Sequence, residues 1–173
     1  MNTPVEVVVL GSGFAGSLIA LALRQRGREV LLIERFQHPR FVIGESTTPL
    51  TNLFLEEFAQ TYDLPELRPL VKWGSWRREV PGAAVGLKRG FSFYHHQWDQ
   101  PFHDTASREA QLLVAASPHD QIADTHWYRP DFDHHLLRLA VARGVSHVDQ
   151  TEVLSFTYAG GLAELKTKRG TET

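Results

Sequence analysis

The feature that most constrains the fold is a glycine-rich turn at residues 11–16, GSGFAG, which fits the pattern G-x-G-x-x-G. It follows residues 5–10, an almost wholly apolar, valine-rich run that is typical of a strand buried on both faces of a parallel sheet. Residues 17–26 have the apolar face of a helix, and Gly27 is a natural stop. A second apolar strand is expected at Val30–Ile33. This order predicts a βαβ unit with a right-handed crossover.

The glycine turn and an acidic residue behind it together predict a dinucleotide site. Glu34 stands at the end of the second predicted strand, about 20 residues after the motif, where such sites carry a carboxylate. Gly11 permits the tight turn, Gly13 lets a pyrophosphate approach the backbone, and Gly16 lets helix and strand pack closely. The helix N-terminus stabilises phosphates. Glu34 would accept hydrogen bonds from ribose hydroxyls and disfavours a 2′-phosphate, so NADP is not expected. The glycines alone do not separate FAD from NAD.

The remaining chain alternates between helical and extended patterns. Expected helices lie at residues 51–59, 64–74, 106–117 and 131–144, the last with Asp131 as its N-cap and Gly144 as its end. Expected strands lie within residues 76–96 and at 145–148, 152–158 and 162–168, the last two joined by a turn at Gly160-Gly161. The segment between Val30–Ile33 and the first of these helices carries Pro39, Gly44 and Pro49, and is expected to be a loop.

These elements predict an α/β fold, in which a Rossmann-like, nucleotide-binding domain is interrupted by part of a β-rich second domain. We expect residues 1–75 and 126–173 to form the nucleotide-binding domain, incompletely, and residues 76–125 to belong to a substrate-binding domain. A sheet of this kind normally needs one more strand after a hairpin such as residues 152–168. We therefore expect the chain to be the N-terminal part of a longer protein.

Composition excludes several classes of function. The 173 residues contain no cysteine, which excludes disulfides, thiolate catalysis and iron–sulfur clusters. The net charge of −2 gives no reason to expect a nucleic-acid partner. The longest nearly apolar run, residues 18–23, is too short to cross a bilayer, and the N-terminus does not resemble a signal peptide. We expect a cytoplasmic protein without membrane contact. The nine histidines show no metal-ligand spacing, so no metal site is predicted.

Two further segments resemble a known family. GESTTP at residues 44–49 resembles the G-E-[SA]-[TS]-x-P segment of flavin-dependent halogenases, which forms a strap along the flavin and links the flavin site to the substrate site. Residues 129–137, RPDFDHHLL, resemble the R-x-x-F-D-x-x-L segment of the same group. The chain is therefore similar to the N-terminal portion of tryptophan-halogenase-like enzymes, a branch of the FAD-dependent monooxygenases.

The resemblance implies FAD as the cofactor. Arg129 would lie near the flavin, and the strand carrying Glu152-Val153 would bring a backbone near the adenine. Glu45 could act as a general base, cap the helix near Thr51, or position the strap, and the last role is favoured. The expected cofactor-binding residues are Gly11, Gly13, Phe14, Ala15, Gly16, Glu34, Arg35, Glu45, Ser46, Thr47, Arg129 and Val153.

The resemblance also gives Lys88 a catalytic role. Residues 88–93, KRGFSF, have the spacing K-x-G-x-x-F that surrounds the catalytic lysine of these halogenases. There, reduced flavin, O₂ and halide give hypohalous acid, which the lysine directs to an electron-rich aromatic ring. A compact cation with rotatable donors suits that task, and aromatic neighbours would lower its pKa. A solvated lysine at the mouth of a strand fits the same residues. Phe91 and Phe93 are expected to be packing residues.

The implied partners are a small aromatic substrate, free or carrier-bound, a halide ion, and a separate flavin reductase that supplies FADH₂. Two alternatives stay open. The protein could be a reductase or hydroxylase of the geranylgeranyl-reductase and aromatic-hydroxylase group, in which Lys88 is incidental. It could also be an inactive FAD-binding fragment, because the flavin-ring contacts in this family come largely from a later part of the chain.

Overall fold

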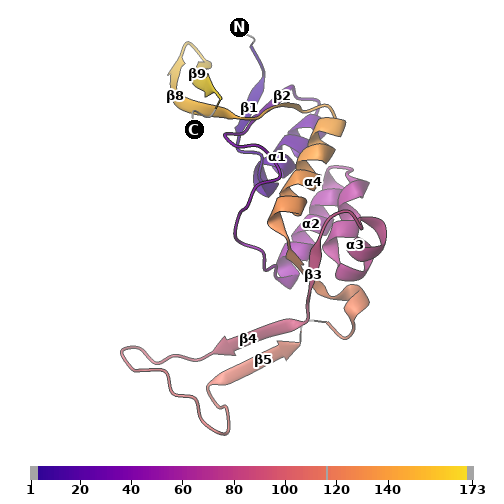
Figure 1. Ribbon diagram of the computed structural model, residues 1–173, viewed down its shortest axis with the longest axis vertical. Helices are drawn as coiled ribbons and strands as arrows, with labels where there is room; N and C mark the ends of the chain where they lie inside the picture. The colour runs from indigo at the N-terminus through magenta and orange to yellow at the C-terminus, as the bar shows by residue number, and fades with distance from the viewer. Residues whose placement is uncertain (1–3, 116, 171–173) are drawn as a thin grey trace.

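A computed structural model describes residues 4–115 and 117–170, and the predicted βαβ unit is present at its start. Strands β1 (Val7–Leu10), β2 (Val30–Ile33) and β7 (Ser146–Val148) form a parallel sheet in the order β1-β2-β7. Helix α1 (Phe14–Gln25) connects β1 to β2 (Figure 1). The three predicted strands and the helix are confirmed, although α1 begins three residues before the predicted start, because Gly13 is its N-cap.

Four helical segments lie between this sheet and the rest of the molecule (Figure 1). They are α2 (Pro49–Thr61), the 3₁₀ helix η1 (Pro65–Val71), α3 (Trp73–Glu79) and α4 (Arg129–Ala142). The prediction that strands begin at Trp76 was wrong, since Trp76 lies inside α3. Its ring is fully buried, and its Nε1 donates to the Ala83 carbonyl at 3.0 Å. The burial of Trp76 stabilises a helical turn that the local sequence pattern does not predict.

The hydrophobic core includes buried residues of α1 and α4 and of the elements that pack against them. Trp127 stacks on Phe132 with ring centroids 4.1 Å apart, and Trp76 lies 5.4 Å from Phe132 on another side. Aliphatic residues of β2, α1, α2, η1 and α4 complete the cluster, among them Leu21, Leu32, Leu55, Leu67, Leu70, Leu136 and Leu137. The predicted apolar face of α4 is confirmed, since Leu136, Leu137 and Ala140 are buried. This core sets the position of α4 relative to the glycine turn.

Helix α4 begins differently from the prediction. Asp131 is not its N-cap, because the helix starts at Arg129 with Tyr128 as the N-cap residue. Pro130 suits the first turn of a helix, where its missing N–H has no partner to lose. The Asp131 carboxylate instead accepts a hydrogen bond from the Ala84 amide at 2.9 Å. Gly144, with a φ of +89°, follows the last helical turn as predicted.

Two antiparallel pairs occupy the predicted insert. Strand β3 (Val85–Lys88) pairs with β6 (Asp124–Trp127), and β4 (Gly90–Tyr94) pairs with β5 (Gln111–Ala115). A short 3₁₀ turn, η2 (Asp120–Ile122), precedes β6. The β4–β5 hairpin projects away from the helices (Figure 1). The helix predicted at residues 106–117 was wrong over the part that the structure describes, because residues 111–115 form β5 and pair with β4, while residue 116 lies outside the described residues.

The last two strands, β8 (Thr151–Ala159) and β9 (Leu162–Arg169), form the predicted hairpin. Gly160 and Gly161 make its turn, with φ values of +61° and +80°. The hairpin lies at the sheet end of the molecule, far from the β4–β5 arm (Figure 1). In the part of the chain that the structure describes, no helix has the length and apolar character needed to span a membrane.

Candidate active site

The glycine turn has the geometry that the motif requires. Gly11 has a φ of +91°, and its amide donates to the Ile33 carbonyl at 2.7 Å. A Cβ on Gly16 would lie 1.8 Å from the Gly11 carbonyl oxygen, so α1 packs against this turn at a distance that excludes any side chain. Gly13 has an extended backbone and gives no side-chain cap to α1. The amides at the start of α1, including those of Phe14 and Ala15, therefore have no side-chain cap.

Glu34 closes the turn from the end of β2. Its Oε2 accepts from the Ser12 amide at 2.9 Å and from the Ser12 hydroxyl at 3.2 Å, while its Oε1 accepts from the Phe36 amide at 3.0 Å. Burial of the side chain opposes ionisation and is the largest single influence. The backbone donors of Phe36 and Ser12 and the charge of Arg40 outweigh it, so the pKa of Glu34 lies below its usual range. The carboxylate is ionised at neutral pH.

Two basic residues near the turn were not assigned from the sequence. Arg40 places its guanidinium 3.4 Å from Glu34 Oε2, and its Nη2 lies 3.3 Å from where a Cβ of Gly13 would stand. His38 Nε2 lies 2.8 Å from the Ser12 hydroxyl. Burial, followed by the Arg40 charge, lowers the pKa of His38. Their position in the sequence could have identified these two residues, because the segment that follows β2 must pass over the turn that precedes α1.

Arg129 connects the start of α4 to both the glycine turn and the strap. Its guanidinium makes a bidentate pair with Asp133, at 2.8 and 2.9 Å, and both side chains are buried. Its Nη1 donates to the Ile43 and Gly44 carbonyls at 2.9 and 3.2 Å. The guanidinium also lies over the Phe14 ring, 4.6 Å from its centroid. Asp133 was not assigned from the sequence, although its i,i+4 spacing from Arg129 was a usable signal.

Residues 44–49 form a strap that runs beside β6. The Trp127 amide donates to the Glu45 carbonyl at 2.7 Å, and Ser46 bridges His126 in antiparallel fashion. The Thr47 amide and hydroxyl donate to the Thr125 carbonyl at 3.3 and 2.6 Å. The backbone of Glu45 therefore helps to fix the strap while its side chain is exposed. The strap is anchored to the sheet that carries Lys88.

The cap of α2 is Thr48, not Glu45. The Thr48 hydroxyl accepts from the Thr51 amide at 3.3 Å, and Thr51 Oγ1 accepts in return from the Thr48 amide at 3.4 Å. This reciprocal arrangement is a capping box. The strap therefore ends where α2 begins, without help from the Glu45 carboxylate.

Lys88 is buried and points at the strap. Only 7% of the residue is exposed, and its ammonium donates to the Ser46 hydroxyl at 2.6 Å and to the Thr47 carbonyl. The Nζ also lies 4.0 Å from the centroid of the Phe91 ring. Burial lowers the pKa of Lys88, while the nearby charge of Asp124 raises it. The geometry is that of a positioned cation and differs from a solvated lysine at the mouth of a strand.

The surroundings of Lys88 contain two further polar residues that sequence reasoning missed. Asp124 is its cross-strand partner in the β3–β6 pair, and Asn52 of α2 donates to Asp124 Oδ1 at 2.7 Å. Both are buried. Of the two phenylalanines expected to pack, Phe91 lies under the ammonium, whereas Phe93 stacks on Phe91 and is 55% exposed.

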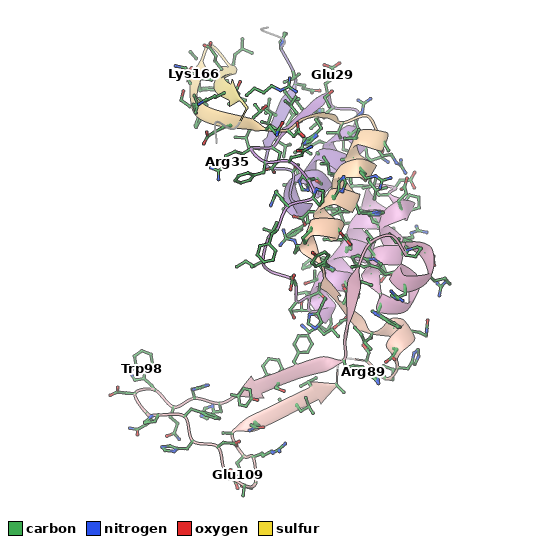
Figure 2. All side chains as sticks on the ribbon, viewed as in Figure 1. Glu29, Arg35, Arg89, Trp98, Glu109 and Lys166 are labelled. Atoms are coloured by element: carbon green, nitrogen blue, oxygen red, sulfur yellow. The ribbon has the colours of Figure 1, made fainter. Side chains whose placement is uncertain are left out.

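The remaining predicted residues lie near the sheet, away from Lys88. Arg35 follows Glu34 and is exposed, with its guanidinium 4.5 Å from the Phe36 ring centroid and 3.7 Å from the Glu152 carboxylate. Val153 is half-buried on β8. Figure 2 shows Arg35 beside the β8–β9 hairpin and Arg89, the neighbour of Lys88, at the root of the β4–β5 arm. The predicted residues thus form two groups, around the glycine turn and around Lys88, with the strap between them.

The first group fits the adenosine diphosphate part of a dinucleotide. A turn that tolerates no side chain at Gly16 leads into a helix whose first amides have no side-chain cap, and the guanidinium of Arg40 lies beside it. An ionised carboxylate, Glu34, stands at the end of the neighbouring strand. Such groups bind a pyrophosphate and a ribose. Among the described residues, no cluster of three or more histidine, aspartate or glutamate side chains could hold a metal ion.

Comparisons with known proteins agree with this geometry. The halogenase PltM, solved in complex with phloroglucinol and FAD, superposes with a TM-score of 0.79 and 27% identity over 96% of this chain and 32% of that chain. Monodechloroaminopyrrolnitrin halogenase PrnC of Pseudomonas fluorescens is 34% identical over 151 residues, which are 87% of this chain and 26% of that protein. Tetracycline 7-halogenase of Kitasatospora aureofaciens is 28% identical over 83% of this chain and 25% of that protein.

The chain therefore spans about a quarter of the length of these curated relatives and about a third of the solved structures. The profile of the family described as FAD dependent oxidoreductase matches residues 6–173, almost the whole chain. The chain belongs to the FAD-dependent oxidoreductase family.

Proposed function

We propose that this chain is the part of a flavin-dependent halogenase that holds the adenosine diphosphate portion of FAD and presents the lysine that directs halogenation. The observation that carries the proposal is the position of Lys88, which is buried with its ammonium bonded to Ser46 and Thr47 of the strap. The names of the similar proteins, which are halogenases, support it.

The cofactor would be held by the first group of residues. The amides of Gly13, Phe14 and Ala15 and the guanidinium of Arg40 would bind the pyrophosphate, and Glu34 would accept hydrogen bonds from the ribose. Arg35, Val153 and the strap would lie along the rest of the nucleotide and the flavin. When bound and reduced, the flavin would supply hypohalous acid from O₂ and a halide ion.

Lys88 would act as a hydrogen-bond donor to that oxidant. Its ammonium has three donors, of which two are used by the Ser46 hydroxyl and the Thr47 carbonyl. The third is available to orient a small polar molecule. Because the neighbouring Phe91 ring and the strap exclude water, a hydrogen bond made there is stronger than in solvent.

The burial of Lys88 favours this proposal over a reductase or hydroxylase in which the lysine is incidental. An incidental lysine is normally exposed, because burying an ammonium is costly unless it has partners. Here the ammonium donates to a hydroxyl and a carbonyl, and the charge of the cross-strand Asp124 acts on it as well. A role for the cation in contact with a reactant would explain why the chain buries a charged group despite the cost in free energy.

The partners of the proposed enzyme follow from the same chemistry. They are a small electron-rich aromatic substrate, a halide ion and a separate reductase that supplies FADH₂. One relative, a 1H-pyrrole-2-carbonyl-[peptidyl-carrier protein] brominase of Pseudoalteromonas luteoviolacea, acts on a carrier-bound ring, and both free and carrier-bound substrates fit the proposal. We propose a cytoplasmic location.

The test is the replacement K88A in the halogenase that carries this chain, supplied with FADH₂, O₂, halide and an aromatic probe such as phloroglucinol. Halogenated product is expected to disappear, while the consumption of FADH₂ by O₂ continues. K72A is the matched control, because Lys72 is exposed between η1 and α3, and it should halogenate normally. Halogenation that survives K88A would refute the assignment of Lys88.

A further inference from the structure

A buried aspartate, Asp124, lies opposite Lys88 in the β3–β6 pair, and its charge raises the pKa of the lysine. Asp124 and Lys88 are direct partners in the antiparallel register, and both are buried. Facing residues in such a pair have neighbouring side chains. Asp124 Oδ2 is buried and has no hydrogen-bond partner among the described residues. A buried carboxylate in this state is costly unless a cation lies nearby, and Lys88 supplies that cation.

Asn52 fixes the orientation of this carboxylate from a different element. Its Nδ2 donates to Asp124 Oδ1 at 2.7 Å, and the asparagine is itself buried on the first turns of α2. Because Thr48 caps the same helix and belongs to the strap, α2 connects the anchor of Asp124 to the segment that receives the Lys88 ammonium. The lysine, the carboxylate and the strap therefore share one rigid support.

Other charged or titratable residues lie near Lys88 in the chain or across the strand pair. His126 of β6 lies close enough for the Lys88 charge, after burial, to lower its pKa, while Glu45 of the strap raises it. Arg89, the next residue of the chain, is paired with Asp120 at 2.7 Å on the exposed side. Asp124 is the acidic group whose charge acts on Lys88 against its burial.

We propose that Asp124, held by Asn52, is the positioning residue of Lys88, which keeps the ammonium charged and directed at the strap. This inference rests on the proposed function of Lys88 and adds to it. Without the Asp124 charge, burial acts on the lysine unopposed, and the amine loses its proton at a lower pH. A neutral amine has one donor fewer and no charge with which to hold an anionic or polar oxidant.

The test is the isosteric replacement D124N in the same halogenase, with ¹³Cε-labelled lysine followed by NMR from pH 6 to 11. The Lys88 resonance is identified by its loss in K88R. Its titration midpoint is expected to fall by about one pH unit or more in D124N. The control is D120N, which removes an equal charge from the exposed pair with Arg89 and should leave the midpoint in place. An unchanged midpoint in folded D124N would overturn the proposal.

A second readout links the inference to catalysis. The alkaline limb of the halogenation rate should move to lower pH in D124N by the same amount as the NMR midpoint, and D124E should restore part of it. If K88A retains halogenation, the proposed function fails, while the NMR shift still reports whether Asp124 controls Lys88. A shifted midpoint with an unmoved rate profile would overturn the positioning role.

If D124N does not fold, the coupling between Asp124 and Lys88 can be tested in the wild-type protein. With ¹³Cγ-labelled aspartate, the Asp124 carboxyl resonance should show an inflection at the pH where Lys88 titrates, because the two charges are neighbours. K88R, whose guanidinium keeps its proton throughout this range, should abolish that inflection. A flat Asp124 resonance across the Lys88 titration would contradict the proposal.

Discussion

At the scale of single residues, the glycine turn depends on Gly16, where there is no room for a side chain. A Cβ at Gly16 would stand 1.8 Å from the backbone oxygen of Gly11, and backbone cannot rotate out of the way as the end of a side chain can. The turn and the helix would have to separate. Since α1 also packs against α4, that separation would disturb the buried side chains between the two helices, such as Leu21 and Leu136.

The replacement G16A is therefore expected to lower the free energy of unfolding by about 3 kcal/mol or more, as overpacking at a rigid site does. FAD uptake should be lost with it. Urea unfolding followed by circular dichroism measures the first effect, and absorbance near 450 nm after incubation with FAD measures the second. G82A is the control, since a Cβ at Gly82 meets nothing within 4 Å, and its stability should change by no more than about 0.5 kcal/mol. Equal stability of the two variants would show that the turn can yield.

The motif residues were predictable from sequence because each one acts through its neighbours along the chain. Gly11, Gly16 and Glu34 belong to one βαβ unit, whose geometry is fixed by strand and helix length. Asp124 and Asn52 lie 72 residues apart and meet only through the fold. No spacing rule describes such a pair, so sequence reasoning missed the residues behind Lys88. Lys88 itself was selected by the resemblance, and its catalytic role stays a prediction.

At the scale of elements, the buried pair Arg129–Asp133 joins the start of α4 to the strap. The same guanidinium that meets Asp133 also donates to the Ile43 and Gly44 carbonyls. Position 44 has a φ of +96°, which favours glycine, and a Cβ there would stand 3.3 Å from Arg129 Nη1. The arginine therefore fixes the strap, and with it the groups that receive Lys88.

Removing both partners of this pair is expected to cost less than the sum of the two single losses. D133L leaves a buried guanidinium without its carboxylate, and R129M leaves a buried carboxylate alone, so each should lower the free energy of unfolding by about 3–5 kcal/mol. The double variant should recover at least about 1 kcal/mol relative to the sum of the two losses. Urea unfolding of the four proteins gives this coupling energy. Strictly additive losses would mean that the pair is not coupled.

Two elements show where local patterns stopped being informative. Residues 106–117 contain an apolar run that fits a helix or a strand, and β5 was decided by its backbone partners on β4. Helix α3 was hidden for a related reason, because its tryptophan and arginines have no strong helical pattern and the turn is held by the burial of Trp76. Elements with a clear period, such as α1, α4 and the parallel strands, were predicted.

At the scale of the whole molecule, large apolar side chains are exposed in several regions, which include the segment around the strap and the start of α2, the β4–β5 arm, and the β8–β9 hairpin. The β4–β5 arm exposes Phe93, Leu112, Leu113 and Trp98, and Figure 2 shows Trp98 near the far end of the arm. The β8–β9 hairpin exposes Phe156, Tyr158 and Leu162. Surface of this kind usually marks contact with other protein. The division into residues 1–75 and 126–173 against 76–125 stays a prediction, although the β3–β6 pair crosses its boundary, because Val85 and Gly86 of β3 pair with Trp127 and His126 of β6.

Acid stability is set across the molecule by histidines from separate elements. Burial is the main cause that lowers the pKa of His38, His135 and His147 below the ordinary value of 6.5. Below about pH 6.5 the histidines therefore bind more protons in the unfolded chain than in the folded chain. The free energy of unfolding falls as the pH drops. The lowered pKa of Glu34 acts in a separate window, because its contribution is lost only as the pH falls below 4.5.

The free energy of unfolding is accordingly expected to fall by about 1–3 kcal/mol between pH 7.5 and pH 5.5, before any carboxylate is protonated. Urea unfolding at the two pH values measures the difference. Replacing His135 by glutamine should reduce it, because glutamine takes up no proton on unfolding. H119Q is the matched control, since it removes a histidine from an exposed position, and the pH difference of this variant should equal that of the wild type. A free energy of unfolding that is flat, or that rises toward pH 5.5, would mean that these rings accept protons in the folded protein, and the buried environment assigned to them would be wrong.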